Sequence, residues 1–293
     1  MSLLNSIPFS RMLDSRLLRG RAVGRRERVF SNFDEERILR NYIADLLPAG
    51  RRHTAVDLGA GDGIRHSNTH ALFAAGWAGL AVEADSRRAY RLARTYRKHP
   101  RVYVSRCRVT PHNVVALLEA YELEPEFDVL SLDIDSYDYW VLDALLARFR
   151  PRLIVTEINE KIPPPIKFVV KYDADFQLRH HFYGYSIESL TELCARHAYA
   201  LLELEYNNAF LAPAELAPAS RTAMEAYRRG YLERADRQAK FWLNHDMEIL
   251  HTLSPTAGVE FLQRFFARHE GKYEIGLPAP VQTEADVCAL SEV

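Results

Sequence analysis

The sequence predicts an α/β fold built on a mostly parallel sheet with helices on both faces. Beyond residue 53, short apolar runs alternate with helical stretches, and a glycine-rich turn directly follows the first of these runs. Near residue 207, two closely linked apolar runs indicate an antiparallel hairpin. Alternating strands and helices are typical of βαβ units, whose crossovers place helices on both faces of a parallel sheet.

The expected elements follow from the apolar runs and the residues that interrupt them. Strands are expected at residues 53–58, 79–83, 101–105, 127–132 and 152–157, and helices at 64–75, 86–98, 111–121 and 137–148. Prolines at 163–165 break this rhythm because proline lacks a backbone N–H, and an irregular segment is expected to about Tyr185. A helix at 186–197 and hairpin strands at 199–204 and 208–211 complete the predicted sheet.

Three regions are expected along the chain. Residues 1–50 form a basic arm, with seven arginines among the first thirty residues, followed by an amphipathic helix. Residues 51–213 form the sheet domain, and residues 214–293 form a helical extension with helical stretches near 221–247 and 259–269. The tail from Gly276 is expected to be loosely ordered.

Composition narrows the functional classes. The 38 basic and 39 acidic residues nearly cancel, so the molecule as a whole has no field that favours nucleic acid or an acidic membrane. The three cysteines, Cys107, Cys194 and Cys288, are widely spaced and lack a CxxC pair, which disfavours a disulfide framework. Arg11 interrupts the N-terminus before an apolar run is built, and no later run is long enough to span a bilayer. A cytoplasmic protein with neither nucleic acid nor membrane as partner is therefore expected.

The glycine-rich turn is the strongest motif. Residues 56–63 are VDLGAGDG, a GxGxG spacing in which Gly59, Gly61 and Gly63 follow an apolar strand and precede a helix. Glycine permits a tight turn and lets a ligand lie against backbone N–H groups. The spacing alone is shared with dinucleotide-binding folds, and a turn that only packs strand against helix is the alternative.

Carboxylates around this turn point to a cationic ligand. Glu83 ends the second predicted strand in the sequence VEAD, about twenty residues beyond the turn, where a carboxylate accepts both hydroxyls of a ribose. Asp57 precedes the turn and Asp62 lies within it, so a diphosphate would be repelled there, whereas an ammonium group would be attracted. The sequence therefore favours S-adenosylmethionine over a nicotinamide, flavin or nucleotide sugar, which the same fold binds in oxidoreductases.

These motifs, with residues 127–140 (FDVLSLDIDSYDYW) and 151–157 (PRLIVTE), resemble class I S-adenosylmethionine-dependent methyltransferases, particularly the FkbM-like branch, over residues 53 to about 212. The resemblance implies a Rossmann-like sheet of order 3-2-1-4-5-7-6 with strand 7 antiparallel. It also implies methyl transfer, usually to a hydroxyl of a sugar or natural product. Members characteristically end a strand in D-[VI]-E-G, whereas this chain has Asp133-Ile134-Asp135-Ser136. The departure bears on the acceptor more than on the cofactor.

Three groups of side chains are expected around the cofactor: the turn and its carboxylates, the start of the following helix, and the end of the third strand beside the adenine. They are Asp57, Gly59, Ala60, Gly61, Asp62, Asn68, Glu83, Ala84, Cys107, Arg108 and Asp133. A polar helix start explains Asn68 equally well, and Cys107 is expected as an apolar contact because no catalytic partner is evident.

Two adjacent strand ends carry candidate metal ligands. Asp133 and Asp135 follow one strand, and Glu157 and Asn159 follow the next. Carboxyl ends of parallel strands meet at one edge, so four oxygen donors could hold Mg²⁺ there, which resembles the metal site of catechol O-methyltransferase. The metal would lower the pKa of an acceptor hydroxyl. In the metal-free alternative Asp135 is a general base, and carboxylates at strand ends also serve simply as helix caps.

His180 and His181 are rival bases, since imidazole takes a proton near neutral pH. They lie in a segment rich in aromatic residues that could form a lid or a stacking platform, and ordinary packing is the alternative. The leading hypothesis is O-methylation of a small molecule or glycan. The alternatives are N-methylation, or a non-catalytic binding or scaffold protein on the same fold, with a homodimer formed through the helical extensions.

Overall fold

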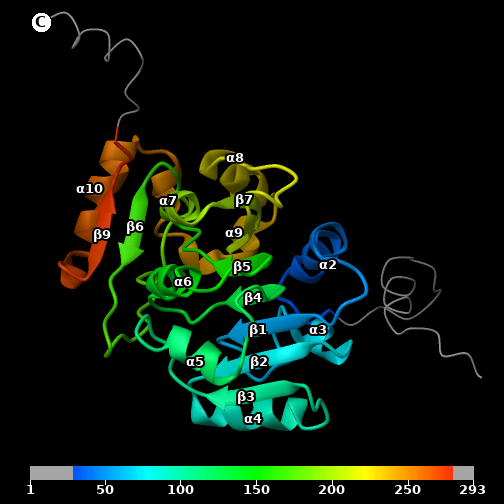
Figure 1. Cartoon of the computed structure of the whole chain (residues 1–293). Helices are drawn as coiled ribbons and strands as arrows, with labels where there is room; N and C mark the ends of the chain where they lie inside the picture. Colours follow the sequence, from blue (N-terminus) through cyan, green and yellow to red (C-terminus); the bar gives the residue numbers. More distant parts are fainter. Residues whose placement is uncertain (1–28, 280–293) are drawn as a thin grey trace, which may run out of the picture.

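The computed structural model describes residues 29–279, so the predicted basic arm up to Arg28 and Cys288 lie outside the described residues. A seven-stranded sheet runs through the centre of the molecule (Figure 1). Its strands are β1 (Thr54–Leu58), β2 (Ala78–Glu83), β3 (Val102–Arg106), β4 (Val129–Leu132), β5 (Leu153–Glu157), β7 (Tyr199–Glu205) and β8 (Asn208–Pro213).

The strand order is β3-β2-β1-β4-β5-β8-β7. The first five strands pair in parallel, and β8 is antiparallel to both β5 and β7. Within this sheet β7 and β8 are the sixth and seventh strands along the chain. The predicted Rossmann-like order 3-2-1-4-5-7-6 with an antiparallel seventh strand is therefore confirmed.

Helices cover both faces of the sheet. They are α2 (Glu35–Leu46), α3 (His70–Ala74), α4 (Ser86–Tyr96), α5 (Val114–Ala120), α6 (Asp138–Leu146) and α7 (Ile187–His197). Successive side chains of a strand point to opposite faces. Accordingly, Val56 of β1 packs in a core cluster with α5, α6 and α7, whereas its neighbour Ala55 packs in a second cluster with α2, α3 and α4.

Local side-chain bonds set where several helices begin. The Asp85 carboxylate accepts the N–H groups of Arg87 and Arg88 and caps α4, and the Ser186 hydroxyl caps α7. The helix predicted at 64–75 is shorter, because residues 64–69 form turns. Asp62 Oδ1 accepts the N–H groups of Ile64 and Arg65, an interaction that competes with a helical start at that point.

A second, two-stranded sheet joins the segment after β5 to the C-terminal part of the described chain. Strand β6 (Lys167–Val170) pairs antiparallel with β9 (Tyr273–Gly276). The expectation of irregular chain over this segment is wrong for β6. Phe168 and Val170 of β6 pack with Leu262 and Phe266 in a third apolar cluster, so the C-terminal segment is anchored on the rest of the fold.

The region between β8 and β9 is helical in short pieces. It holds α8 (Ala223–Tyr227), a π-helical turn (Arg228–Leu232), α9 (Arg237–Lys240), α10 (Pro255–Phe265) and 3-10 turns that include Trp242–Asn244 and Glu248–His251. Thr222 and Glu225 form a capping box at the start of α8. Over residues 29–279, no helix combines the length and the apolar character that a membrane crossing requires.

Candidate functional site

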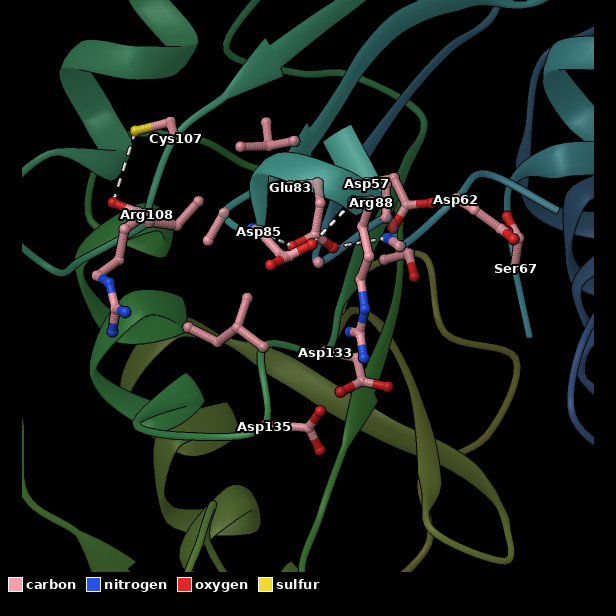
Figure 2. Close-up of a pocket in the computed structure, with 18 of the residues that line it drawn as sticks. Asp57, Asp62, Ser67, Glu83, Asp85, Arg88, Cys107, Arg108, Asp133 and Asp135 are labelled. Atoms are coloured by element: carbon pink, nitrogen blue, oxygen red, sulfur yellow. Dashed lines mark hydrogen bonds between the residues drawn. The ribbon is translucent and has the colours of Figure 1, made fainter. Parts of the chain in front are cut away.

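A cavity of about 970 Å³ opens at the carboxyl ends of β1, β2, β3 and β4. In open α/β sheets this edge is where ligands bind. Every residue that the sequence predicts as a cofactor contact lines this cavity, and so does Asp135. Figure 2 shows the labelled carboxylates of Asp57, Glu83, Asp133 and Asp135 at this cavity.

The glycine-rich turn combines a packing role with an open backbone. Gly59 has φ +98°, and a Cβ there would lie 1.7 Å from the Asp133 carbonyl oxygen, so packing against the end of β4 requires glycine. Gly61 has φ +58°, yet a Cβ there would meet nothing within 4 Å. Packing therefore explains only the first of these glycines. The backbone at Gly61 borders open cavity.

Glu83 is held by the turn it faces. Its side chain is 7% exposed; Oε2 accepts the Gly61 N–H at 2.9 Å, and Oε1 accepts the Asp85 N–H at 2.7 Å (Figure 2). Each carboxylate oxygen accepts more than one hydrogen bond, so both retain capacity toward the cavity. The arrangement fixes an anionic acceptor pair beside the turn.

Asp57 is also buried, with 5% exposure, and bonded to neutral hydroxyls. Its Oδ2 accepts the Thr69 hydroxyl at 2.5 Å. Burial raises the Asp57 pKa to about 6, against hydrogen bonds from Thr69 and Ser131 that lower it. The carboxylate is therefore mostly ionised at pH 7, and its partner Thr69 is the buried residue that precedes α3.

Farther along the cavity edge, Asp133 and Asp135 converge with Glu157, which does not itself line the cavity in the described part of the chain. Oxygens of Asp133, Asp135 and Glu157 all lie within 4.8 Å of one another. Asp133 and Asp135 line the cavity and are exposed to it, yet many protein atoms surround their carboxyl groups. Desolvation by these atoms, together with repulsion from the other carboxylates, raises the pKa of Asp133 and of Glu157. Burial also raises the pKa of Asp135. The cluster is electrostatically unfavourable without an added positive charge.

The backbone that carries the cluster is firmly held. Asp138 Oδ1 accepts the Ile134 N–H at 2.7 Å, and Oδ2 accepts the Ser136 N–H at 2.9 Å. Asp135 lies between these two anchors with φ +56°, a conformation that the surrounding bonds impose on it. Glu157 Oε1 accepts the Asn207 side-chain N–H at 2.6 Å, which fixes the third carboxylate.

Two basic residues act on the cluster from a distance. The charges of Arg88 and Lys161 lower the pKa of Asp135 against the larger effect of burial. Figure 2 shows the Arg88 side chain pointing from α4 toward Asp133 and Asp135. In the part of the chain that the structure describes, however, no arginine or lysine forms an ion pair with any of the three carboxylates. Three hard oxygen donors without a fixed counter-charge fit a divalent cation such as Mg²⁺.

Asn159, the fourth predicted ligand, is engaged elsewhere. It is fully buried, and its side-chain amide donates to the carbonyl oxygens of His181 at 2.9 Å and Tyr183 at 3.0 Å. Its Oδ1 accepts from the Lys161 ammonium at 3.5 Å. An amide oxygen that already faces a cation is poorly placed to bind a second one.

The two candidate histidines also lie elsewhere. Among the described residues neither ring lines the cavity, and both instead adjoin Asp246 from the C-terminal region. The aromatic residues near them are packed. The ring of Tyr172 contacts the ring of buried Tyr137 edge-on, with the ring centroids 4.8 Å apart, and Phe176 stacks on Phe182. The geometry thus favours the packing role over an open lid.

Sequence reasoning missed two basic residues at the site. Arg88 stands three positions after Asp85 in the first turn of α4, so the predicted strand and helix boundaries could have placed it at the sheet edge. Lys161 lies in the segment expected to be irregular, where it pairs with the Glu160 carboxylate at 3.1 Å, and both are buried. Nothing in the local sequence pattern marks that pair.

No family model matches the chain, and no curated protein matches it either. Among solved structures, the CurJ carbon methyltransferase is similar with 11% identity and TM-score 0.42, covering 64% of this chain and 54% of that chain. A putative O-methyltransferase from Klebsiella pneumoniae has 15% identity and TM-score 0.38, covering 72% and 91%. The N-terminal domain of EvdMO1 with SAH bound has 13% identity and TM-score 0.40, covering 62% and 82%. The chain thus spans about half the length of CurJ.

Proposed function

We propose that this protein is an S-adenosylmethionine-dependent methyltransferase that acts on a hydroxyl of a small molecule or glycan. One observation carries the proposal: a single cavity joins a glycine turn framed by Asp57 and Glu83 to Asp133 and Asp135, two members of a cluster of three carboxyl groups. The first group suits a cationic nucleoside, and the second suits activation of an acceptor. The resemblance to the FkbM-like branch supports the same interpretation.

The cofactor end is assigned by charge and hydrogen bonding. Glu83 would accept the ribose hydroxyls, while Asp57 and Asp62 would favour the positive charge of the methionine part. Asn68, whose amide donates to the Ser131 hydroxyl at 3.4 Å, borders that end of the cavity. Cys107 and Arg108, beyond β3, would flank the adenine. These contacts account for the fit of a sulfonium nucleoside.

The acceptor end is assigned by proximity of a base. In an in-line transfer, the acceptor oxygen bonds to the sulfonium methyl carbon, the carbon–sulfur bond breaks, and S-adenosylhomocysteine leaves. In the metal-free case Asp135, a member of the cluster that lines the cavity, would take the hydroxyl proton. Mg²⁺ bound by Asp133, Asp135 and Glu157 would lower the pKa of that hydroxyl. A neutral amine needs no such activation, so this end favours a hydroxyl acceptor over an amine.

A second candidate function is that of an oxidoreductase that binds a nucleotide sugar or a dinucleotide. The exposed arginines that line the cavity favour it. Five arginines line the cavity with exposed side chains: Arg65, Arg88, Arg91, Arg106 and Arg108. Guanidinium groups bind phosphate well. The turn itself, where a diphosphate would meet the helix, carries Asp57, Asp62 and Glu83 instead. We therefore rank this candidate second.

Titration calorimetry separates the candidates. The full chain is titrated with S-adenosylmethionine, S-adenosylhomocysteine and NAD, with Glu124→Gln as a control variant that removes an exposed carboxylate outside the cavity. Binding of both sulfur nucleosides in the micromolar range, with NAD much weaker, is expected. If neither sulfur nucleoside binds, the proposal is wrong, and tighter binding of NAD would favour the second candidate.

A further inference from the structure

A cluster of His180, His181 and Asp246 lies outside the cavity. The two histidines precede α7 in the segment after β6, and Asp246 lies between the 3-10 turns Trp242–Asn244 and Glu248–His251. One potential ligand atom from each residue lies within 4.8 Å of the other two. Two segments far apart in sequence thus bring two imidazoles and one carboxylate together.

His181 is buried with an unpartnered ring nitrogen. Its side chain is 3% exposed, and among the described residues Nδ1 has no hydrogen-bond partner. Nε2 lies 3.0 Å from Asp246 Oδ1. A buried polar nitrogen without a partner is costly, which points to a group that the ring would bind.

Lys161 is the basic residue whose charge acts on the His181 ring. The Lys161 ammonium is itself paired with the Glu160 carboxylate, with Nζ 3.1 Å from Oε1. A metal ion could therefore approach the ring without facing an unpaired cation.

The backbone on either side of the cluster is fixed. The Asn159 amide donates to the His181 and Tyr183 carbonyl oxygens, which holds the histidine segment. On the other side, Asn244 donates to Glu160 Oε1 at 2.7 Å, and Met247 is buried in the third apolar cluster. The three ligands are thus preorganised by contacts that are independent of any metal.

We propose that His180, His181 and Asp246 form a binding site for a first-row transition metal of the zinc type. Two imidazoles and one carboxylate are a ligand set of zinc proteins, whereas Mg²⁺ and Ca²⁺ prefer oxygen ligands alone. His180 is exposed and Asp246 is 38% exposed, so water has access to the remaining coordination position. Such an ion would tie the segment after β6 to the C-terminal region. The site is chemically distinct from the all-oxygen cluster in the cavity.

The test uses the full chain without a histidine tag, stripped with a chelator and then titrated with ZnCl₂ by calorimetry in excess Mg²⁺. Visible spectra with CoCl₂ report the coordination geometry. One equivalent of Zn²⁺ and tetrahedral Co²⁺ bands are expected for the wild type. Asp246→Ala and His180→Gly, the latter chosen because His180 has φ +50°, should each weaken Zn²⁺ binding about 10-fold or more.

Two control variants locate the metal. Asp135→Asn changes the cavity cluster, and His112→Ala removes an exposed histidine elsewhere. Both should keep wild-type Zn²⁺ affinity, and circular dichroism confirms that each variant is folded. The proposal is overturned if wild type binds Zn²⁺ with Kd weaker than about 100 µM. It is equally overturned if the two site variants bind as tightly as wild type, or if Asp135→Asn alone loses the metal.

Discussion

The two ends of the cavity hold their carboxylates in opposite ways. At the glycine turn, Glu83 accepts two backbone N–H groups and Asp57 accepts a hydroxyl, so each charge has its own donors. At the other end, Asp133, Asp135 and Glu157 face one another, and repulsion adds to burial in raising the pKa of Asp133 and Glu157. The first end is stable as it stands; the second gains most from a proton or a cation.

This difference indicates that the two ends of the cavity have separate roles. Carboxylates with fixed donors keep their position, which suits recognition of a cofactor whose charge does not change on binding. Carboxylates that compete for a proton are sensitive to whatever arrives beside them, which suits an acceptor or a metal.

Asp135→Asn should abolish most methyl transfer. Losing a general base typically costs a factor of about 10² to 10⁴ in kcat. The measurement is formation of S-adenosylhomocysteine and of methylated product by mass spectrometry, using the best acceptor from a panel of monosaccharides and phenols. The cofactor Kd should stay within about two-fold of wild type, since Asp135 belongs to the acceptor end.

Asp175→Asn, which changes an exposed aspartate outside the cavity, serves as the control for this assay. Unchanged kcat in Asp135→Asn, or an equal loss in both variants, would refute the assignment of Asp135. A large loss of cofactor affinity in Asp135→Asn would instead contradict the division between the two ends.

Glu83→Gln should weaken S-adenosylmethionine binding about 10- to 100-fold, because a hydrogen bond to a charged group contributes about 1.5–3 kcal/mol. Calorimetry measures the Kd. The amide oxygen of glutamine can accept only one of the two backbone N–H groups, of Gly61 and Asp85, that Glu83 accepts, so the melting temperature should fall by a few degrees while the protein stays folded. Wild-type affinity in this variant would remove Glu83 from the cofactor site.

Mg²⁺ should raise the melting temperature of the wild type by about 3 to 5 °C when present at about ten times its Kd, which contributes about 1.4 kcal/mol. Glu157→Gln should lose this response. In EDTA the same variant should be at least as stable as wild type, because it removes one of three mutually repelling carboxyl groups. If Mg²⁺ stabilises both proteins equally, the cluster does not bind it.

How far sequence predicts this molecule depends on how local the determinants are. The turn at Gly59 and the strand ending at Glu83 follow from short motifs, and their close approach is dictated by the parallel order of neighbouring strands. The convergence of Asp133, Asp135 and Glu157 was predictable for the same reason. The alternation of apolar runs predicted the individual strands and the hairpin, whereas their order in the sheet was predicted from the family resemblance.

The remaining features depend on contacts between distant segments. Strand β6 has only four residues, and its partner β9 lies about a hundred residues later, so nothing local identifies the pair. The same holds for Asp246 beside His181, and for Asn159, whose amide is occupied by the carbonyl oxygens of a later loop. The ends of the strands identified the candidate ligand residues, but the hydrogen-bond partners of these residues depend on tertiary packing that no local pattern shows.

The smallest expected effect concerns Asp57 and acidity. Burial raises its pKa to about 6, so it gains a proton in the free protein as the pH falls through 6. The ionised form of Asp57 favours binding of a cationic cofactor, and loss of a nearby charge costs about 1 kcal/mol. The Kd of the cofactor should therefore rise roughly two- to five-fold between pH 7 and pH 5.

His66 also lines the cavity, and its protonation at low pH would act in the same direction. Asp57→Asn distinguishes the two: the pH dependence of Kd should flatten if Asp57 is responsible and persist if His66 is. Persistence would show that the turn recognises its ligand without this charge.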